Sequence, residues 1–171
     1  LVTNDSKQET VLFSKKIIIS TGSRSRELPD LKQDGKNIIC YREAMTLKTQ
    51  PKDITIVGSG AIGIEFAFFY NSMGTNVTVI EYQDRIVPVE DKEISKELEK
   101  ILKKKGIKII TSSEVKEAKI NESGVELNIK SSSGEISNIS SEIVLSAVGI
   151  KTNIENIGLE KIGIKIEADK I

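Results

Sequence analysis

Three glycines between an apolar run and a helix-like stretch constrain the fold of this chain more than any other feature. Residues 53–65 have the sequence Asp-Ile-Thr-Ile-Val-Gly-Ser-Gly-Ala-Ile-Gly-Ile-Glu. The apolar residues before Gly58 predict a buried strand, and apolar residues at helical spacing then predict a helix that Gly74 terminates. Gly58 permits a tight turn, and Gly63 lets the helix pack closely on the strand. The pattern therefore predicts a strand, a turn and a helix in direct succession.

The predicted turn also has the outline of a dinucleotide site. Gly60 has no Cβ, so the main chain there can approach a pyrophosphate closely. The helix that begins at about Ala61 directs its unpaired N–H groups and its positive dipole end at this turn, which stabilises a diphosphate without a lysine. Glycine triplets with this spacing also occur by chance in ordinary strand-to-helix turns. The strand predicted next, at residues 76–80, and the acid that ends it favour the dinucleotide site.

That acid is Glu81, which follows Gly63 by 18 residues. This offset is near the one expected for a carboxylate that accepts hydrogen bonds from ribose hydroxyls. At a distance of about 4 Å, a carboxylate and a 2′-phosphate repel by roughly 1 kcal/mol per charge pair in water and about 4 kcal/mol at an effective dielectric near 20. Glu81 therefore predicts NAD rather than NADP. Two alternatives stay open, because Glu81 could be a solvated strand-end charge and Arg85 could receive a phosphate.

Composition places the chain among ordinary soluble globular proteins. Its 171 residues, 29% charged and 38% hydrophobic, are enough for one substantial core. Basic and acidic residues each number 25, so overall charge attracts neither nucleic acid nor a membrane, and the apolar runs are too short to cross a bilayer. Because no signal peptide is apparent, we expect a cytoplasmic protein. The first residue is Leu rather than Met, which suggests a piece of a longer protein.

The chain has no histidine and a single cysteine. These counts exclude a disulfide within one copy, a Cys/His metal cluster and an imidazole base. Cys40 follows apolar residues in a strand-like run, where a buried hydrophobe is expected rather than a nucleophile. We therefore predict no catalytic residue and no metal site in this chain.

Strand-like and helix-like patterns alternate along the chain. The expected elements are strands at 11–13 and 15–20, a short segment at 41–47, a strand at 54–57, a helix at 62–73, a strand at 76–80, a helix at 92–105, a strand at 107–110, a meander at 115–120, 124–130 and 135–139, and a buried strand at 142–148. This order predicts an α/β fold, a Rossmann-like doubly wound parallel sheet with an antiparallel three-stranded meander as a crossover. Gly58, Glu81, residues 112–115 and Gly149 should then converge at the carboxyl edge of the sheet.

With these elements in place, the chain resembles the pyridine nucleotide-disulfide oxidoreductases, and within them most closely the dihydrolipoyl dehydrogenases. The resemblance covers nearly the whole length and is carried by residues 16–24, 58–67, 77–81, 85–91 and 145–149 with Asn153. It implies a parent FAD enzyme that oxidises dihydrolipoamide and passes a hydride to NAD, as a homodimer serving 2-oxoacid dehydrogenase complexes. This chain would be its NAD-binding portion and would be inactive alone.

The resemblance also implies domain limits and roles for individual positions. Residues 1–36 would end the FAD-binding domain, 37–153 would bind NAD, and 154–171 would return to the FAD-binding domain. Pyrophosphate would lie on the glycine turn, ribose on Glu81, adenine against Val115, and nicotinamide near Glu65 and Gly149. The implied contacts to NAD are Gly58, Ser59, Gly60, Ala61, Ile62, Gly63, Ile64, Glu65, Glu81, Val115 and Gly149, and those to FAD are Thr21, Gly22 and Ser23.

Some positions depart from the family or remain open. Ala61 stands where some relatives have a bulky tyrosine, and Ile150 replaces a common arginine. A C-x4-C disulfide, a first glycine fingerprint, an FAD-binding acid and a His-Glu pair are not in this chain. Glu65 would pair with a lysine beside the flavin, or it could be a first-turn acid favoured by the helix dipole. The parent could also be a soluble transhydrogenase, a mercuric reductase or a glutathione-type reductase. Alternatively, the chain could be a free-standing nucleotide sensor, but such a sensor would not need the FAD-crossover residues 21–23.

Overall fold

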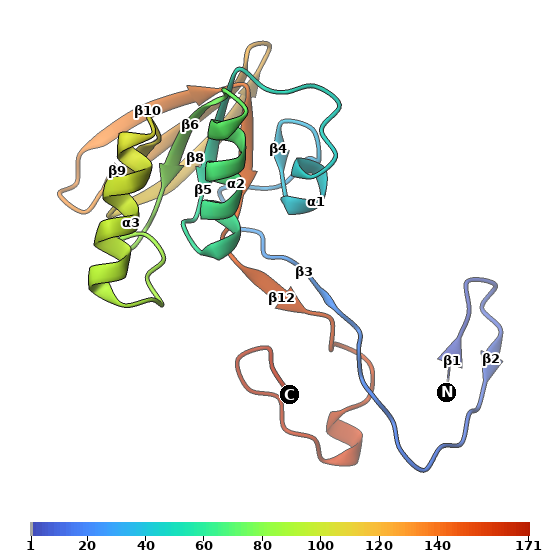
Figure 1. The fold of residues 1–171 in the computed structure, drawn as a ribbon. Coiled ribbons are helices and arrows are strands. Elements are labelled where there is room, and N and C mark those ends of the chain that lie inside the picture. The colour runs from blue at the N-terminus through green and yellow to red at the C-terminus, as the bar shows by residue number, and fades with distance from the viewer. Residues whose placement is uncertain (1) are drawn as a thin grey trace. The chain divides into compact units, whose positions relative to one another are not determined.

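The structure is a computed structural model that describes residues 2–171 (Figure 1). The chain divides into two compact units, one of residues 24–151 and the other of residues 2–23 together with 152–171. Among the described residues, no helix combines the length and the apolar character needed to cross a membrane.

A five-stranded parallel sheet forms the centre of the larger unit. Its order is β4 (Ile38–Ile39), β11 (Ile143–Ser146), β5 (Asp53–Val57), β6 (Asn76–Ile80) and β7 (Lys108–Ile110). Strands β5, β6 and β11 are rich in Ile and Val because both faces of a parallel sheet are normally covered. The chain builds the sheet outward from β5 to β7 and then returns to place β11 on the other side of β5. The predicted doubly wound sheet is confirmed, with its switch point between β5 and β11.

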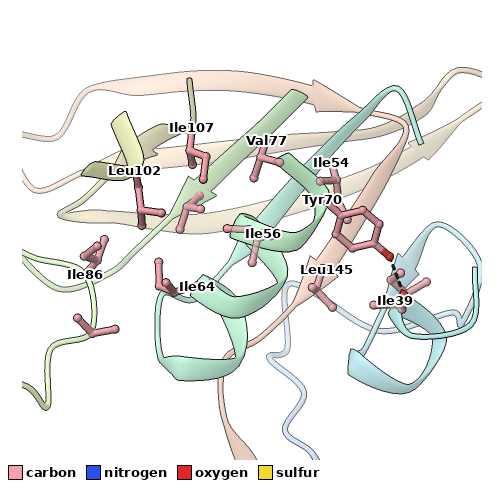
Figure 2. Close-up of a cluster of buried hydrophobic side chains, with 14 residues drawn as sticks. Ile39, Ile54, Ile56, Ile64, Tyr70, Val77, Ile86, Leu102, Ile107 and Leu145 are labelled. Carbon is pink, nitrogen blue, oxygen red and sulfur yellow. Dashed lines mark hydrogen bonds between the residues drawn. The ribbon is translucent and has the colours of Figure 1, made fainter. Parts of the chain in front are cut away.

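Helices α2 (Ala61–Ser72) and α3 (Lys92–Lys104) cover one face of this sheet, together with the short α1 (Tyr41–Ala44) (Figure 1). Asp91 is the N-cap of α3, and its side chain accepts the Glu93 N–H at 2.8 Å. The core between helices and sheet (Figure 2) contains, among others, Ile54, Ile56, Ile64, Ala67, Tyr70, Val77, Val79, Leu102 and Leu145. This packing fixes the start of α2 against the end of β5.

The antiparallel meander covers the opposite face. Strands β8 (Ser113–Asn121), β9 (Gly124–Ser131) and β10 (Ile136–Ser141) pair in the order β10-β9-β8. Their apolar side chains form a second core with alternate residues of the parallel strands. This core includes Val115 and Leu127 from the meander and Val57, Ile80 and Val144 from the parallel strands. The predicted meander is therefore confirmed, with each strand within two residues of its expected start.

The smaller unit has little regular structure. Strands β1 (Val2–Thr3) and β2 (Glu9–Thr10) pair with each other, and a 3₁₀ turn, η1 (Glu160–Ile162), lies in the C-terminal part. Strands β3 (Ser23–Ser25) and β12 (Ile150–Thr152), most of whose residues belong to the larger unit, form a separate two-stranded sheet.

The two strands predicted at residues 11–13 and 15–20 are wrong, because neither of these described segments forms a strand. Their apolar side chains lie largely in solvent, with Phe13 94% and Ile18 91% exposed. A strand needs a neighbour for its N–H and C=O groups and an apolar surface for its side chains. The described part of the chain provides neither at these positions.

Tyr70 joins α2 to α1 across the core, and burial raises the pKa of its hydroxyl. This hydroxyl donates to the carbonyl oxygen of Ala44 at 2.6 Å, the dashed contact in Figure 2. We expect Tyr70→Phe to lower the free energy of unfolding by about 1 kcal/mol, since it leaves a buried carbonyl without this donor. Urea denaturation measures the change, with Tyr82→Phe at an exposed tyrosine as the control. Equal losses in both variants would show that the contact with Ala44 does not stabilise the fold.

Candidate functional site

The carboxyl ends of the parallel strands bring four separate segments to one edge of the sheet. Gly58 follows β5, Glu81 follows β6, residues 111–112 follow β7, and residues 147–149 follow β11. Main-chain hydrogen bonds tie them together. The Gly58 N–H donates to the Ile80 carbonyl at 2.8 Å, and the Glu81 N–H donates to the Ile110 carbonyl at 2.8 Å. The convergence predicted from the strand order is present in the structure.

Two of the three glycines in the turn are required by the chain's own packing. Gly58 has a φ of 100°, and a Cβ built on it would lie 2.5 Å from the Ala147 carbonyl oxygen. A Cβ on Gly63 would lie 2.0 Å from the carbonyl oxygen of Gly58. The structure thus confirms that Gly58 serves the tight turn and that Gly63 serves the close approach of α2 to β5.

Gly60 differs from both of its neighbours in the motif. Its φ of −64° is accessible to any residue, and a Cβ on it would meet no atom of the described chain within 4 Å. Neither backbone conformation nor internal packing therefore requires a glycine at this position. The open space in front of Gly60 is available to a molecule outside the chain.

Gly60 is also the N-cap of α2, and no side chain hydrogen-bonds to this helix end among the described residues. The first intrahelical bond runs from the Ile64 N–H to the Gly60 carbonyl at 3.0 Å. The N–H groups of Ala61, Ile62 and Gly63 precede that bond, so they have no carbonyl partner within the helix. The first turn of α2 contains no acidic residue. This helix end can therefore stabilise an anion.

The other predicted NAD contacts in α2 differ in how far they are buried. Ile64 is buried in the helix-side core, so its side chain faces away from solvent. Ala61 and Glu65 are exposed. Glu65 lies beyond the first turn of α2, so the first-turn alternative for this acid is wrong.

Glu81 is buried, with 7% of its surface exposed. One carboxylate oxygen, Oε2, accepts the Ser59 N–H at 2.8 Å and the Ser59 hydroxyl at 2.6 Å. The other oxygen, Oε1, accepts the Gln83 N–H at 2.8 Å. The alternative that Glu81 is a solvated strand-end charge is therefore wrong. A buried carboxylate held by three donors at the mouth of the glycine turn can accept a further hydrogen bond from a hydroxyl.

Arg85 is held by its own loop. Its Nη1 atom lies 3.0 Å from the Asp84 carboxylate, and its Nη2 donates to the Pro88 carbonyl at 2.9 Å. Beside this loop is an open hollow of about 570 Å³, lined among others by Tyr82, Arg85 and Ser112. A hollow of about 1080 Å³ lies at the amino ends of the strands, far along the sheet from the glycine turn, and is lined by side chains of both charges. The volume of a hollow therefore does not by itself identify the candidate site.

Val115 and Gly149 approach the site from β8 and from the end of β11. The Ser113 N–H donates to the main-chain oxygen of Glu81 at 2.9 Å, which places the start of β8 beside the acid. The Val115 side chain is only 6% exposed because it packs in the meander-side core. Gly149 is exposed, with a φ of 111°, and its carbonyl accepts the Arg26 N–H at 2.9 Å.

The three residues expected at an FAD crossover belong to the smaller unit. There the Asn153 N–H donates to the Gly22 carbonyl at 2.9 Å, and the Asn153 side-chain amide donates to the Thr21 carbonyl at 3.1 Å. Ser23 begins β3. Residues 21–23 and Asn153, which both carry the resemblance to the family, are thus in contact with each other within this unit.

Sequence reasoning missed the bonds around Ser59. Besides its two bonds to Glu81, the carbonyl of Ser59 accepts the Val87 N–H at 2.9 Å. Val87 has a φ of 39°, which is unusual for a β-branched residue. The only sequence signal for the first contact was the presence of a hydroxyl residue between two glycines of the turn. The pattern around Val87 contained no corresponding signal.

The chain is similar throughout its length to known proteins. Residues 1–171 match the family model described as pyridine nucleotide-disulphide oxidoreductase. Among curated relatives, dihydrolipoyl dehydrogenase of Rhizobium etli is 45% identical over 94% of this chain, and that of Bacillus subtilis is 44% identical over 94%. The chain spans 34% of the length of each of these two relatives.

Solved structures agree with this similarity. The crystal structure of LpdA from Mycobacterium tuberculosis superposes with a TM-score of 0.75 and 28% identity, covering 87% of this chain and 32% of that one. The flavoprotein disulfide reductase RclA from Escherichia coli, at 24% identity and a TM-score of 0.72 over 88% of this chain and 34% of that one, shares the fold. The chain belongs to the pyridine nucleotide-disulphide oxidoreductase family.

Proposed function

We propose that residues 37–153 bind NAD across the carboxyl edge of the parallel sheet. The observation that carries this proposal is Gly60, a glycine that the fold itself does not need. It stands at the uncapped start of α2, where N–H groups and the helix dipole favour a diphosphate. A side chain at this position would occupy the space that the pyrophosphate takes. The family of the chain, whose name specifies a pyridine nucleotide, supports the same ligand.

Glu81 would set which nucleotide binds. Its carboxylate lies at the end of β6 with one oxygen, Oε1, bonded to a single N–H, so this oxygen can accept one hydroxyl of the adenosine ribose. The same charge would repel the 2′-phosphate of NADP. Adenine would then lie toward the start of β8 near Val115, where the buried side chain offers little surface, and nicotinamide toward Glu65 and Gly149.

For the whole protein, we propose an FAD-dependent dihydrolipoyl dehydrogenase that oxidises dihydrolipoamide and transfers a hydride to NAD. The support is the identity to proteins of that name, at 45% and 44%. Its FAD would contact residues 21–23. We propose a cytoplasmic homodimer that serves 2-oxoacid dehydrogenase complexes. Residues 1–171 alone should not turn over dihydrolipoamide, since the sequence has no histidine and no cysteine pair.

The exposed apolar residues near the N-terminus support the proposed domain limits. Residues 11–13 and 17–19 expose large apolar side chains, including Phe13 and Ile18. Such side chains are normally buried. These side chains would be covered if residues 1–36 and 154–171 belong to an FAD-binding domain that other segments of the parent complete.

The proposed NAD site is tested by Gly60→Ala. We expect this variant to lose no more than about 1 kcal/mol of stability, the cost of alanine at an N-cap position, because the added methyl meets no atom of the chain. We expect NAD affinity to fall by about 10-fold to 100-fold, since lost hydrogen bonds to a charged group are worth about 1.5 to 3 kcal/mol. Calorimetric titration measures the affinity, and urea denaturation measures the stability.

An unchanged NAD affinity in a folded Gly60→Ala variant would remove the main support for the proposal. A separate assay addresses the parent enzyme. Measurable dihydrolipoamide oxidation by residues 1–171, without any added protein, would contradict the view that the catalytic groups lie outside this chain.

A further inference from the structure

We infer that Ser59 is a positioning residue for NAD that acts through Glu81 and does not itself touch the coenzyme. This inference rests on the proposed function, because it explains how the carboxylate that selects the nucleotide is held. It assigns to Ser59 a role different from the pyrophosphate contact that its place in the glycine turn suggests.

The hydroxyl of Ser59 is directed into the protein. Ser59 has 0% of its surface exposed, and its hydroxyl lies 2.6 Å from Oε2 of Glu81. A carboxylate is an acceptor, so the hydroxyl donates its one proton in this contact. It has no second proton to donate to a phosphate oxygen, and its burial keeps a ligand away from it.

The two carboxylate oxygens of Glu81 accept different numbers of hydrogen bonds from the protein. Oε2 accepts two hydrogen bonds, from the Ser59 N–H at 2.8 Å and from the hydroxyl at 2.6 Å. Oε1 accepts one, from the Gln83 N–H at 2.8 Å. Since each carboxylate oxygen has about two acceptor positions, Oε2 is filled by the protein and Oε1 keeps one for a ligand. The Ser59 N–H and hydroxyl together therefore leave Oε1 to face the ribose, and the hydroxyl fills the second acceptor position of Oε2.

The main chain of Ser59 is held on both sides independently of its hydroxyl. Its N–H donates to Glu81, and its carbonyl accepts the Val87 N–H at 2.9 Å. Substitution by Ala keeps both of these bonds and introduces no additional heavy atom. Ser59→Ala therefore removes the hydroxyl while the glycine turn retains its anchors.

The inference predicts a loss that is specific for NAD. We expect Ser59→Ala to weaken NAD binding by about 10-fold, the lower end of the range for a lost hydrogen bond to a charged group. NADP binding should change by less than about 2-fold, because NADP has no 2′-hydroxyl to bond with Glu81. The ratio of NADP to NAD dissociation constants in residues 1–171, measured by calorimetric titration, should fall by about 5-fold or more.

Two further comparisons separate positioning from general damage. In a Glu81→Ala background, the Ser59→Ala substitution should change NAD affinity by less than about 2-fold, since the carboxylate it acts on is gone. Ser141→Ala is the matched control, because Ser141 is buried and its hydroxyl donates to the Ile143 carbonyl at 3.0 Å near the amino end of β11. This control should leave NAD affinity unchanged.

The possible results are distinguishable. Equal weakening of NAD and NADP by Ser59→Ala would indicate a direct pyrophosphate contact and overturn the inference. An unchanged NAD affinity would overturn it as well, and so would a full effect in the Glu81→Ala background. If Glu81→Ala does not fold, the NADP to NAD ratio of Ser59→Ala alone decides. Failure of the unsubstituted chain to bind NAD would instead contradict the proposed function.

Discussion

Gly63→Ala should destabilise the larger unit by about 3 kcal/mol or more, the largest effect on folding that we expect from a single methyl group. The added Cβ would lie 2.0 Å from the main-chain oxygen of Gly58 and 3.4 Å from the Cβ of Ala147. Alanine in a helix is favoured over glycine by about 1 kcal/mol, which acts in the opposite direction. The steric conflict outweighs this gain, because the atom that must move is backbone in a tight turn.

Urea denaturation followed by circular dichroism measures the expected loss in Gly63→Ala. Gly60→Ala is the matched control, since it adds the same methyl group to the same motif where no atom lies within 4 Å. Equal stability of the two variants would show that α2 is not packed against the turn as described.

Glu81→Ala should reduce both NAD affinity and stability. We expect NAD binding to weaken by about 1.5 to 3 kcal/mol through the lost hydrogen bond from ribose. Stability should fall by about 2 kcal/mol or more, because the Ser59 N–H, the Ser59 hydroxyl and the Gln83 N–H all lose their acceptor. Calorimetric titration with NAD and NADP and urea denaturation measure the two effects separately.

Glu65→Ala provides the comparison for stability, because Glu65 is an exposed acid on α2 and its loss should leave the free energy of unfolding unchanged. If a folded Glu81→Ala variant binds NAD as tightly as the wild type and NADP no more tightly, Glu81 does not select the nucleotide. The repulsion argument for NAD over NADP would then be wrong.

The parts of the fold that the sequence predicted correctly are those with strong local periodicity. The apolar run before Gly58, the helical spacing up to Met73 and the turn sequences of the meander each specify an element within a few residues. The position of each element in the sheet followed from general rules of parallel topology. The glycine turn could therefore be located before its surroundings were known.

The features that could not be predicted depend on contacts between distant residues. The segments at 11–13 and 15–20 have apolar patterns typical of strands, but pairing requires a neighbour that the described chain does not supply. The bond between Ser59 and Glu81 joins residues 22 positions apart, and its geometry depends on how β6 is placed beside β5. Val87, whose N–H bonds to the Ser59 carbonyl, has a φ of 39°, and no local propensity of a β-branched residue favours this conformation.

The central claim is that NAD binds at the start of α2 and at Glu81. Titration of isotope-labelled residues 1–171 with NAD, followed by amide chemical shifts in NMR spectra, tests this claim most directly. We expect saturable shifts for the N–H groups of Ser59, Gly60, Ala61 and Gln83, with the amides lining the hollow at the amino ends of the strands unchanged. Saturating NAD that leaves the glycine turn unshifted, or that shifts only the opposite end of the sheet, would contradict the account.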